Sequence, residues 1–349
     1  MYSQGVMSLG INLIPKSHQF HVKKGYHPTQ VSGILRTMES PARCNASGAM
    51  HTSQCLQREL STNMRYEAPT TTKEAATLLA REKGESFVLA GGTDLLVRMK
   101  TGLSDPDLVV DIKHIPAMQE IKTTASGTSI GAAVSGARLG ENKALKKAWP
   151  GVVEATNLIG SDQVQGRATM VGNLCNASPA ADSVPAMIAA GAKATVVGPK
   201  KRRTVAVEKI ATGPGQTSLE KGEVIESITL PKRSGKSGDA YLRFIPRTEM
   251  DIAVVSAGVN LTLEKGVIKT ARVCLGAVGP TAVLVPDAAK AVIGTKLDKT
   301  ALESLATACS AACNPIDDKR GTVEYRTKVA GVLGRRAAEI AFKRAGGSK

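Results

Sequence analysis

The chain has 349 residues, of which 42% are hydrophobic and 22% charged, a composition that excludes a wholly disordered chain, a collagen-like repeat and an array of coiled coils. At about 150 residues per domain, this length predicts two domains. The 46 Lys and Arg residues outnumber the 30 Asp and Glu residues and give a net charge of +16, but only 3% of the residues are aromatic. So few aromatic side chains form no platform for stacked bases, so no nucleic-acid-binding module is expected. The net charge is still compatible with a basic surface that faces an acidic partner.

Residues 1–63 differ from the rest of the chain. They hold four of the five His residues and show little sustained hydrophobic periodicity. They contain no basic segment followed by an apolar core of the signal-peptide type, and no apolar run in the chain reaches the length of about 18 residues that a transmembrane helix needs. We expect residues 1–63 to be a disordered extension that could be absent from the native protein.

The predicted elements begin with a helix that starts at the capping-box sequence Thr71–Glu74. The apolar run Phe87–Ala90 predicts a buried strand, and it leads directly into Gly91-Gly92-Thr93-Asp94 and a short helix over residues 95–100. Paired glycines let a backbone approach a ligand closely, and a helix start favours negative charge, so a pyrophosphate suits this turn. A tight turn that needs glycine only for its backbone angles is the alternative.

A second segment of similar character runs from Ala168 to Asn173 and is followed by a helix that we expect to start near Asp182 or Ser183 and to end at Gly191. Two glycine-bearing loops, neither rich in lysine, suggest one long ligand that is held mainly by backbone groups.

The basic tetrad Lys200–Arg203 separates two strand-like runs, residues 194–197 and 204–207. It is predicted to be a solvated hairpin turn, because charge at turns discourages strand addition; a nuclear localisation signal or phosphate patch is the alternative. After a Gly/Ser/Lys-rich boundary at residues 231–239, we expect a hairpin of strands 251–263 and 267–278 and two helices, residues 300–313 and about 322–344. This order predicts an α+β layer.

The sequence offers few candidate residues for metal binding or nucleophilic catalysis. After residue 63 the only histidine is His114, and none of the six cysteines forms a C-x-x-C pair. Cys309 and Cys313 are spaced i, i+4, but no second pair completes a zinc site. We expect free thiols in a reducing compartment and no catalytic or metal-ligating residue.

From Met64 onward, an ordered set of motifs resembles the FAD-binding medium subunit of molybdenum hydroxylases, the carbon monoxide dehydrogenase and xanthine dehydrogenase type. The resemblance implies a two-subdomain α/β FAD-binding (PCMH-type) fold over residues 64–236, divided at about 118/119, and a smaller α+β domain with an antiparallel sheet and helices over residues 237–349. The motifs are Met64–Pro69, Leu89–Leu96, Ile130–Ala132, Gly160–Val164, Ala168–Asn173, Ala177–Pro179 with Asp182, Arg247 with Asp251–Ala253, and Glu324–Arg326.

The resemblance also implies which residues hold FAD. Val224 and Ile225 would border the ring system, Asp182 would accept hydrogen bonds from the adenosine part, and Arg243 would lie near the polar edge of the flavin, where a cation stabilises the negative charge of the reduced ring. The pyrophosphate would be wrapped by Val88, Leu89, Ala90, Gly91, Gly92, Thr93, Asp94 and Leu95 and by Ala168, Thr169, Gly172 and Asn173.

The chain departs from the family pattern at Gln165-Gly166, where members commonly have Arg-Asn, and at two further positions. Val171 stands where members commonly have glycine, so that loop is reshaped if the position needs a positive φ. Ile159 stands where the xanthine-oxidising branch has an aromatic residue that stacks on the flavin. NAD, a quinone and oxygen are therefore alternative acceptors.

By this resemblance, the chain is an electron-transferring oxidoreductase subunit of a cytoplasmic complex. A molybdenum-cofactor large subunit would oxidise the substrate, a [2Fe-2S] small subunit would relay electrons, and FAD would deliver them to the acceptor, in a dimer of heterotrimers. Two alternatives stay open: a stand-alone FAD-dependent oxidoreductase of the same fold, and a non-enzymatic basic binding protein.

Overall fold

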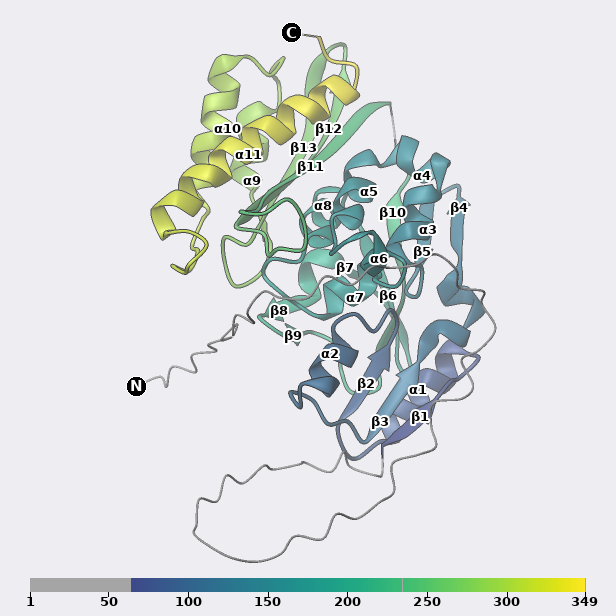
Figure 1. The fold of residues 1–349 in the computed structure, drawn as a ribbon. Helices are drawn as coiled ribbons and strands as arrows, with labels where there is room; N and C mark the ends of the chain where they lie inside the picture. The colour runs from purple at the N-terminus through teal and green to yellow at the C-terminus, as the bar shows by residue number, and fades with distance from the viewer. Residues whose placement is uncertain (1–63, 234, 349) are drawn as a thin grey trace, which may run out of the picture. The chain divides into compact units, whose positions relative to one another are not determined.

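The computed structural model of the protein describes residues 64–233 and 235–348 (Figure 1). The expected disordered extension, residues 1–63, lies outside these ranges. No helix within them is long and apolar enough to cross a membrane.

The first sheet consists of three parallel strands in the order β1–β3–β2. Helix α1 connects β1 to β2 and begins at the expected cap, where the Thr71 hydroxyl accepts a hydrogen bond from the Glu74 N–H at 3.2 Å. Helix α2 follows β2 directly, so the Gly91-Gly92 turn joins a strand to a helix as expected. The elements are β1 (Arg65–Glu67), α1 (Thr72–Arg81), β2 (Ser86–Leu89), α2 (Leu95–Lys100), β3 (Leu108–Asp111) and the 3₁₀ turns η1 (Ile112–His114) and η2 (Pro116–Gln119).

The second sheet has five antiparallel strands in the order β4–β5–β10–β6–β7. Strand β10 lies at its centre, although it is the last of the five in sequence. The strands are β4 (Ile121–Thr124), β5 (Gly127–Gly131), β6 (Lys193–Val197), β7 (Arg202–Ala206) and β10 (Val224–Pro231). Between β5 and β6 run the helices α3 (Gly136–Glu141), α4 (Lys143–Ala148), α5 (Pro150–Asn157), α6 (Asp162–Gln165), α7 (Met170–Cys175) and α8 (Ser183–Ala189). Between β7 and β10 lie the turn η3 (Val207–Lys209) and the small hairpin of β8 (Ala211–Gly213) and β9 (Gln216–Thr217).

The basic tetrad differs from its prediction as a solvated turn. Arg202 and Arg203 belong to strand β7, where they pair with Val197 and Val196. Arg203 binds the buried Glu223 at 2.6 Å and Arg202 binds Glu226 at 2.7 Å. The prediction was wrong for these two residues because their acidic partners come from a distant segment that the sheet brings beside them.

The C-terminal part is the expected antiparallel sheet with helices, in the order β11–β12–β13–β14. Helix α11 runs across the sheet (Figure 1) and approaches β11 so closely that a Cβ atom on Gly238 would lie 2.1 Å from the Ala341 carbonyl oxygen. The elements are β11 (Lys236–Phe244), β12 (Val255–Glu264), β13 (Val267–Gly276), β14 (Val283–Leu284), α9 (Pro286–Val292), α10 (Lys299–Ala311) and α11 (Val323–Arg344).

The predicted hairpin in this sheet forms with a two-residue turn. Lys265 and Gly266 both have positive φ, 52° and 81°, as a turn of type I′ requires. Strand β12 begins at Val255 rather than at Asp251. The preceding residues form a loop, because the Asp251 carboxylate accepts a hydrogen bond from Arg247 at 3.1 Å and the Val254 carbonyl accepts one from the buried Arg326 at 2.8 Å.

Two hydrophobic cores correspond to these parts. One gathers side chains from the first two sheets and their helices, and the other lies between the C-terminal sheet and α9, α10 and α11. Helix α8 joins them, since it packs on β12 so tightly that a Cβ atom on Gly258 would lie 2.7 Å from the Pro185 carbonyl oxygen. The N-terminal core is therefore fixed to the C-terminal sheet by close backbone packing.

Candidate functional site

A cavity of about 380 Å³ lies where the first sheet meets the second. It is lined by the Gly91-Gly92 turn, by the start of α7 and by the first residues of β10, so it brings together segments that are far apart in sequence. Thirteen residues predicted to hold FAD line it: Val88, Ala90, Gly91, Gly92, Thr93, Asp94, Leu95, Ala168, Thr169, Gly172, Asn173, Val224 and Ile225.

The two glycine-bearing loops contact each other at Gly91. A Cβ atom on Gly91 would lie 2.1 Å from the carbonyl oxygen of Arg167, a distance that backbone atoms cannot accommodate. The Arg167 guanidinium also donates to the Gly91 carbonyl at 3.4 Å. Glycine is therefore required here by the contact between the loops. Gly92 is required by its backbone, which has a φ of 78°.

The second loop is capped from within. The Thr169 hydroxyl accepts a hydrogen bond from the Gly172 N–H at 2.9 Å, which sets the first turn of α7. Val171 is a helical residue of α7 and is not among the described residues with positive φ. The replacement of the family glycine by valine thus imposes no left-handed strain on the loop.

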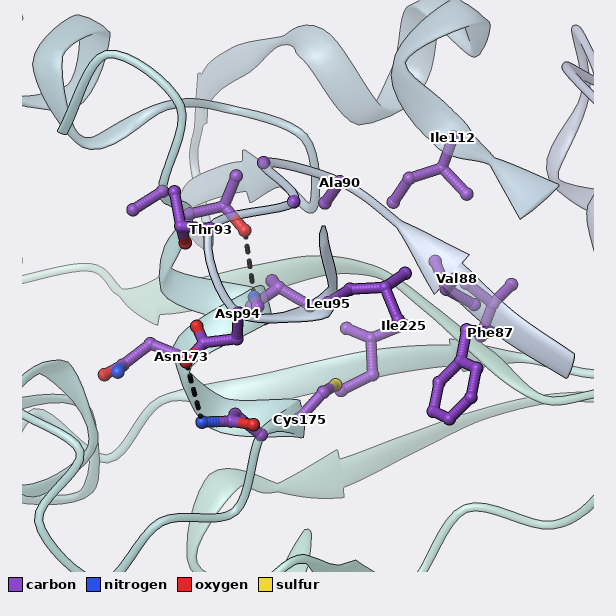
Figure 2. Close-up of a pocket in the computed structure, with 18 of the residues that line it drawn as sticks. Phe87, Val88, Ala90, Thr93, Asp94, Leu95, Ile112, Asn173, Cys175 and Ile225 are labelled. Carbon is purple, nitrogen blue, oxygen red and sulfur yellow. Dashed lines mark hydrogen bonds between the residues drawn. The ribbon is translucent and has the colours of Figure 1, made fainter. Parts of the chain in front are cut away.

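The cavity has an apolar and a polar side. In Figure 2, Phe87, Val88 and Ile112 lie toward one side, whereas Thr93, Asp94 and Asn173 lie toward the other. The Asp94 carboxylate accepts a hydrogen bond from the Asn176 amide at 3.3 Å, which is the second link between the two loops.

Asn173 is held on the polar side by the helix that follows. Its side-chain oxygen Oδ1 accepts hydrogen bonds from the Ser183 N–H at 3.1 Å and from the Ser183 hydroxyl at 2.7 Å. The start of α8 thus positions the end of the second loop. Ile159, which stands at the family's aromatic position, is part of the cavity wall.

Three of the predicted residues lie outside the lining. Leu89 is buried, and its Cδ1 atom would lie 3.0 Å from a Cβ atom added to Gly92. Asp182 and Arg243 bind each other at 2.7 Å, and Asp182 also accepts a hydrogen bond from the Tyr241 hydroxyl at 3.0 Å. Burial raises the pKa of Asp182 to about 6, although Arg243 and Tyr241 act in the opposite direction. In this structure the pair joins the start of α8 to strand β11.

Further lining residues were not anticipated from the sequence. Arg98 lies over the Phe87 ring at 5.4 Å from its centroid, and Glu223 stands directly before Val224. The remaining unanticipated contributors include Gly215, Thr217 and Leu219, which come from the β8–β9 hairpin and the segment after it. Glu223 had a usable signal in its position directly before a predicted site residue, as did Phe87 before Val88 and Val171 before Gly172.

The described lining contains no pair of residues suited to nucleophilic or acid–base chemistry. Burial raises the pKa of the Cys175 thiol to about 12, so it carries almost no thiolate at neutral pH. Glu223 is bound by Arg203, which holds the pKa of its carboxyl below the usual range. Arg98 is the one cation in the described lining. A mixed cavity with small residues, hydroxyls and exposed loop backbone fits a nucleotide cofactor that has an apolar ring and a phosphate bridge.

Comparisons with known proteins give this site its family. Residues 62–233 match a family model described as the FAD binding domain in molybdopterin dehydrogenase, and residues 240–341 match the CO dehydrogenase flavoprotein C-terminal domain. The carbon monoxide dehydrogenase medium chain of Afipia carboxidovorans is 34% identical over 280 residues, 80% of this chain and 97% of that protein. The xanthine dehydrogenase FAD-binding subunit of Escherichia coli O157:H7 is 26% identical over 81% of this chain and 97% of that protein.

The fold is shared with solved structures of the same type. A carbon monoxide dehydrogenase chain from Hydrogenophaga pseudoflava superposes with a TM-score of 0.77 at 32% identity, covering 81% of this chain and 98% of that one. A quinoline 2-oxidoreductase chain from Pseudomonas putida 86 gives a TM-score of 0.75 at 25% identity, covering 81% and 98%. These matches confirm the resemblance inferred from the motifs and the two-subdomain FAD-binding fold with its α+β domain. The chain therefore belongs to the FAD-binding subunits of the molybdopterin dehydrogenases, of the carbon monoxide and xanthine dehydrogenase type, and is an oxidoreductase component whose cofactor is FAD.

Proposed function

We propose that this chain transfers electrons inside a multisubunit molybdenum hydroxylase, from a [2Fe-2S] partner through FAD to a terminal acceptor. The observation that carries the proposal is the cavity itself, which two glycine-bearing loops build together at Gly91. FAD, when bound, supplies the exchange between single-electron donors and a two-electron acceptor. The absence of an acid–base pair from the described lining suits a subunit that leaves substrate chemistry to another chain.

Different residues of the cavity are proposed to contact different parts of the cofactor. We assign the pyrophosphate to the backbone of residues 90–94 and 168–173, and the ring system to the apolar side with Val224 and Ile225. With Arg98 as the one cation in the described lining, the phosphate charge is met mainly by backbone N–H groups and hydroxyls such as that of Thr93. Asp182 and Arg243 are assigned to the joint between the cores.

The proposed partners are a molybdenum-cofactor large subunit and a [2Fe-2S] small subunit, in a dimer of heterotrimers. The relatives named a medium chain and an FAD-binding subunit support a complex with other chains. The four free cysteines among the described residues support a reducing compartment, and we place the complex in the cytoplasm. The acceptor is NAD, a quinone or oxygen.

The test is purification of the chain from its native source, with measurement of its absorption spectrum and its metal content. We expect flavin absorption bands and co-purifying molybdenum and iron, with diaphorase-type activity at most when the chain is isolated. A colourless protein that takes up no FAD would overturn the flavin assignment. A fully active single chain without molybdenum or iron would instead support the stand-alone oxidoreductase.

A further inference from the structure

The segment before Val224, part of which lines the cavity, is held by one ion pair whose carboxylate is buried. Glu223 has a side chain that is only 2% exposed, and it lines the cavity directly before strand β10. Its two carboxylate oxygens accept hydrogen bonds from the Nε and Nη2 atoms of Arg203 at 2.8 and 2.6 Å. Such a two-point contact fixes direction as well as distance.

The same two residues hold the middle of the segment. Arg203 Nη2 also donates to the Ser218 carbonyl at 3.1 Å, and Glu223 Oε2 accepts from the Glu220 N–H at 2.8 Å. On the other side Gly222, with a φ of 83°, packs against α1, where an added Cβ atom would lie 2.7 Å from the Ala80 Cβ. Residues 217–223 are thus fixed between α1 and β7, and three of them, Thr217, Leu219 and Glu223, face the cavity.

The charge of Glu223 has consequences for whatever lies in the cavity. A buried carboxylate in a ligand-site wall repels negative charge unless a cation cancels it. Reduced flavin carries negative charge, so an uncompensated Glu223 would disfavour it. Arg203 supplies the compensation from outside the lining.

We propose that Arg203 is a positioning residue for the flavin site, which orders residues 217–223 and cancels the charge of Glu223 so that the bound flavin keeps its reduction potential. The inference rests on the proposed function in one respect, namely that the flavin ring lies near Val224 and Ile225. It assigns a role to part of a basic tetrad that the sequence predicted to be a solvated turn.

The neighbouring ion pair provides a matched control. Arg202 lies next to Arg203 on the same strand and binds Glu226 at 2.7 Å, but its side chain is 61% exposed and neither partner lines the cavity. Arg202→Gln therefore removes an arginine–glutamate pair of the same kind without changing the charge of the cavity wall.

The experiment measures the midpoint potential of FAD bound to the full chain at pH 8. Arg203→Gln is expected to shift the potential to more negative values and to weaken FAD binding by about tenfold, because it leaves a buried charge without its partner. Glu223→Gln should shift the potential to more positive values, since it leaves the cation uncompensated. The double variant should return close to the wild-type potential, and Arg202→Gln should leave it unchanged. Shifts of the same sign in both single variants, or no shift in either, would overturn the proposal.

A second measurement does not depend on FAD. Lys221 is exposed within the segment, so trypsin cleavage after Lys221 in the cofactor-free protein reports the order of residues 217–223. Cleavage should be faster in Arg203→Gln than in Arg202→Gln or the wild type. Equal cleavage in all three would overturn the proposal even if FAD binds, whereas failure of the wild type to bind FAD, with faster cleavage of Arg203→Gln, would overturn the proposed function and leave the ordering role supported.

Discussion

The close contact between the backbones of Gly91 and Arg167 can be tested by adding a single methyl group at Gly91. In Gly91→Ala the added methyl group would meet the Arg167 carbonyl oxygen at 2.1 Å, so the two loops must separate. Because both loops line the cavity, we expect this variant to retain less than about a tenth of the wild-type FAD, as judged by the ratio of flavin absorbance to protein absorbance after purification.

A nearby glycine distinguishes this effect from a general cost of losing glycine. Gly166 is exposed, has helical backbone angles, and an added Cβ atom would meet only the Gln163 carbonyl oxygen at an ordinary 3.4 Å. Gly166→Ala should keep its flavin. Equal flavin content in Gly91→Ala and Gly166→Ala would show that contact between the loops is not required for binding.

Glycines and polar residues differed in how well their positions could be predicted. Gly91, Gly92 and Gly172 follow from local rules, because a strand, a glycine turn and a helix start leave few arrangements of the backbone. Asp182 and Arg243 were expected at the cofactor by resemblance alone, and in the structure they bind each other. The partner of a charged side chain depends on which distant strand the fold brings beside it, and local pattern does not carry that information.

Among the elements, α11 offers a test of how closely a helix packs on the C-terminal sheet. Gly238 lies on β11 beneath it, and a side chain there would collide with the Ala341 carbonyl. We expect Gly238→Val to lower the free energy of unfolding by about 3 kcal/mol, measured by urea denaturation, because the helix must move off the sheet.

An exposed strand position on the same sheet gives the comparison. Thr270 on β13 is exposed, so Thr270→Ala should change the free energy of unfolding by no more than about 0.5 kcal/mol. A loss in Gly238→Val no larger than that in Thr270→Ala would contradict the close contact with α11, because strand preference alone favours valine over glycine.

For the elements that the sequence predicted, their type and order agree with the structure better than their first and last residues do. The helices predicted from the sequence form as α1, α2, α8, α10 and α11, and the hairpin at Lys265-Gly266 forms as turn chemistry indicates. Helices α3 to α7 and α9 were not predicted. The start of β12 was missed, because residues 251–254 have strand-like composition but their polar groups are bound by arginines from other segments. Similarly, Arg202 and Arg203 have the composition of a turn, yet they extend β7 once their acidic partners lie beside them.

For the molecule as a whole, two buried carboxyl groups lie where the two cores meet. Burial raises the pKa of Asp239 to about 6, as it does for Asp182, against the opposing influence of Arg233. Asp239 accepts a hydrogen bond from the Val152 N–H at 3.1 Å. Its ion-pair partner Arg233 has its Cζ atom 3.8 Å from the centroid of the Trp149 ring. Asp182 thus links the start of α8 to β11, and Asp239 links β11 to α5.

These groups predict a pH dependence of stability with a definite sign. Between pH 4 and pH 6 the folded protein holds more protons at Asp182 and Asp239 than the unfolded chain, whose carboxyls titrate near 3.8. Their contribution to stability is therefore present at low pH and is lost as the pH rises through 6, by at most about 1.4 kcal/mol per pH unit for each group. The unfolding free energy of the wild type minus that of Asp239→Asn should become more positive as the pH falls from 7 to 5. A difference that stays constant over that range would contradict the raised pKa of Asp239.

The central position of β10 bears on how the holoprotein is made. This strand is synthesised after β4, β5, β6 and β7, yet it must insert between β5 and β6. Until it does, a nascent chain presents two unpaired strand edges, which are surfaces that promote aggregation. The same insertion delivers Val224 and Ile225 to the cavity wall. The wall of the proposed flavin site is therefore complete only after residue 231 has been translated and β10 has paired with β5 and β6.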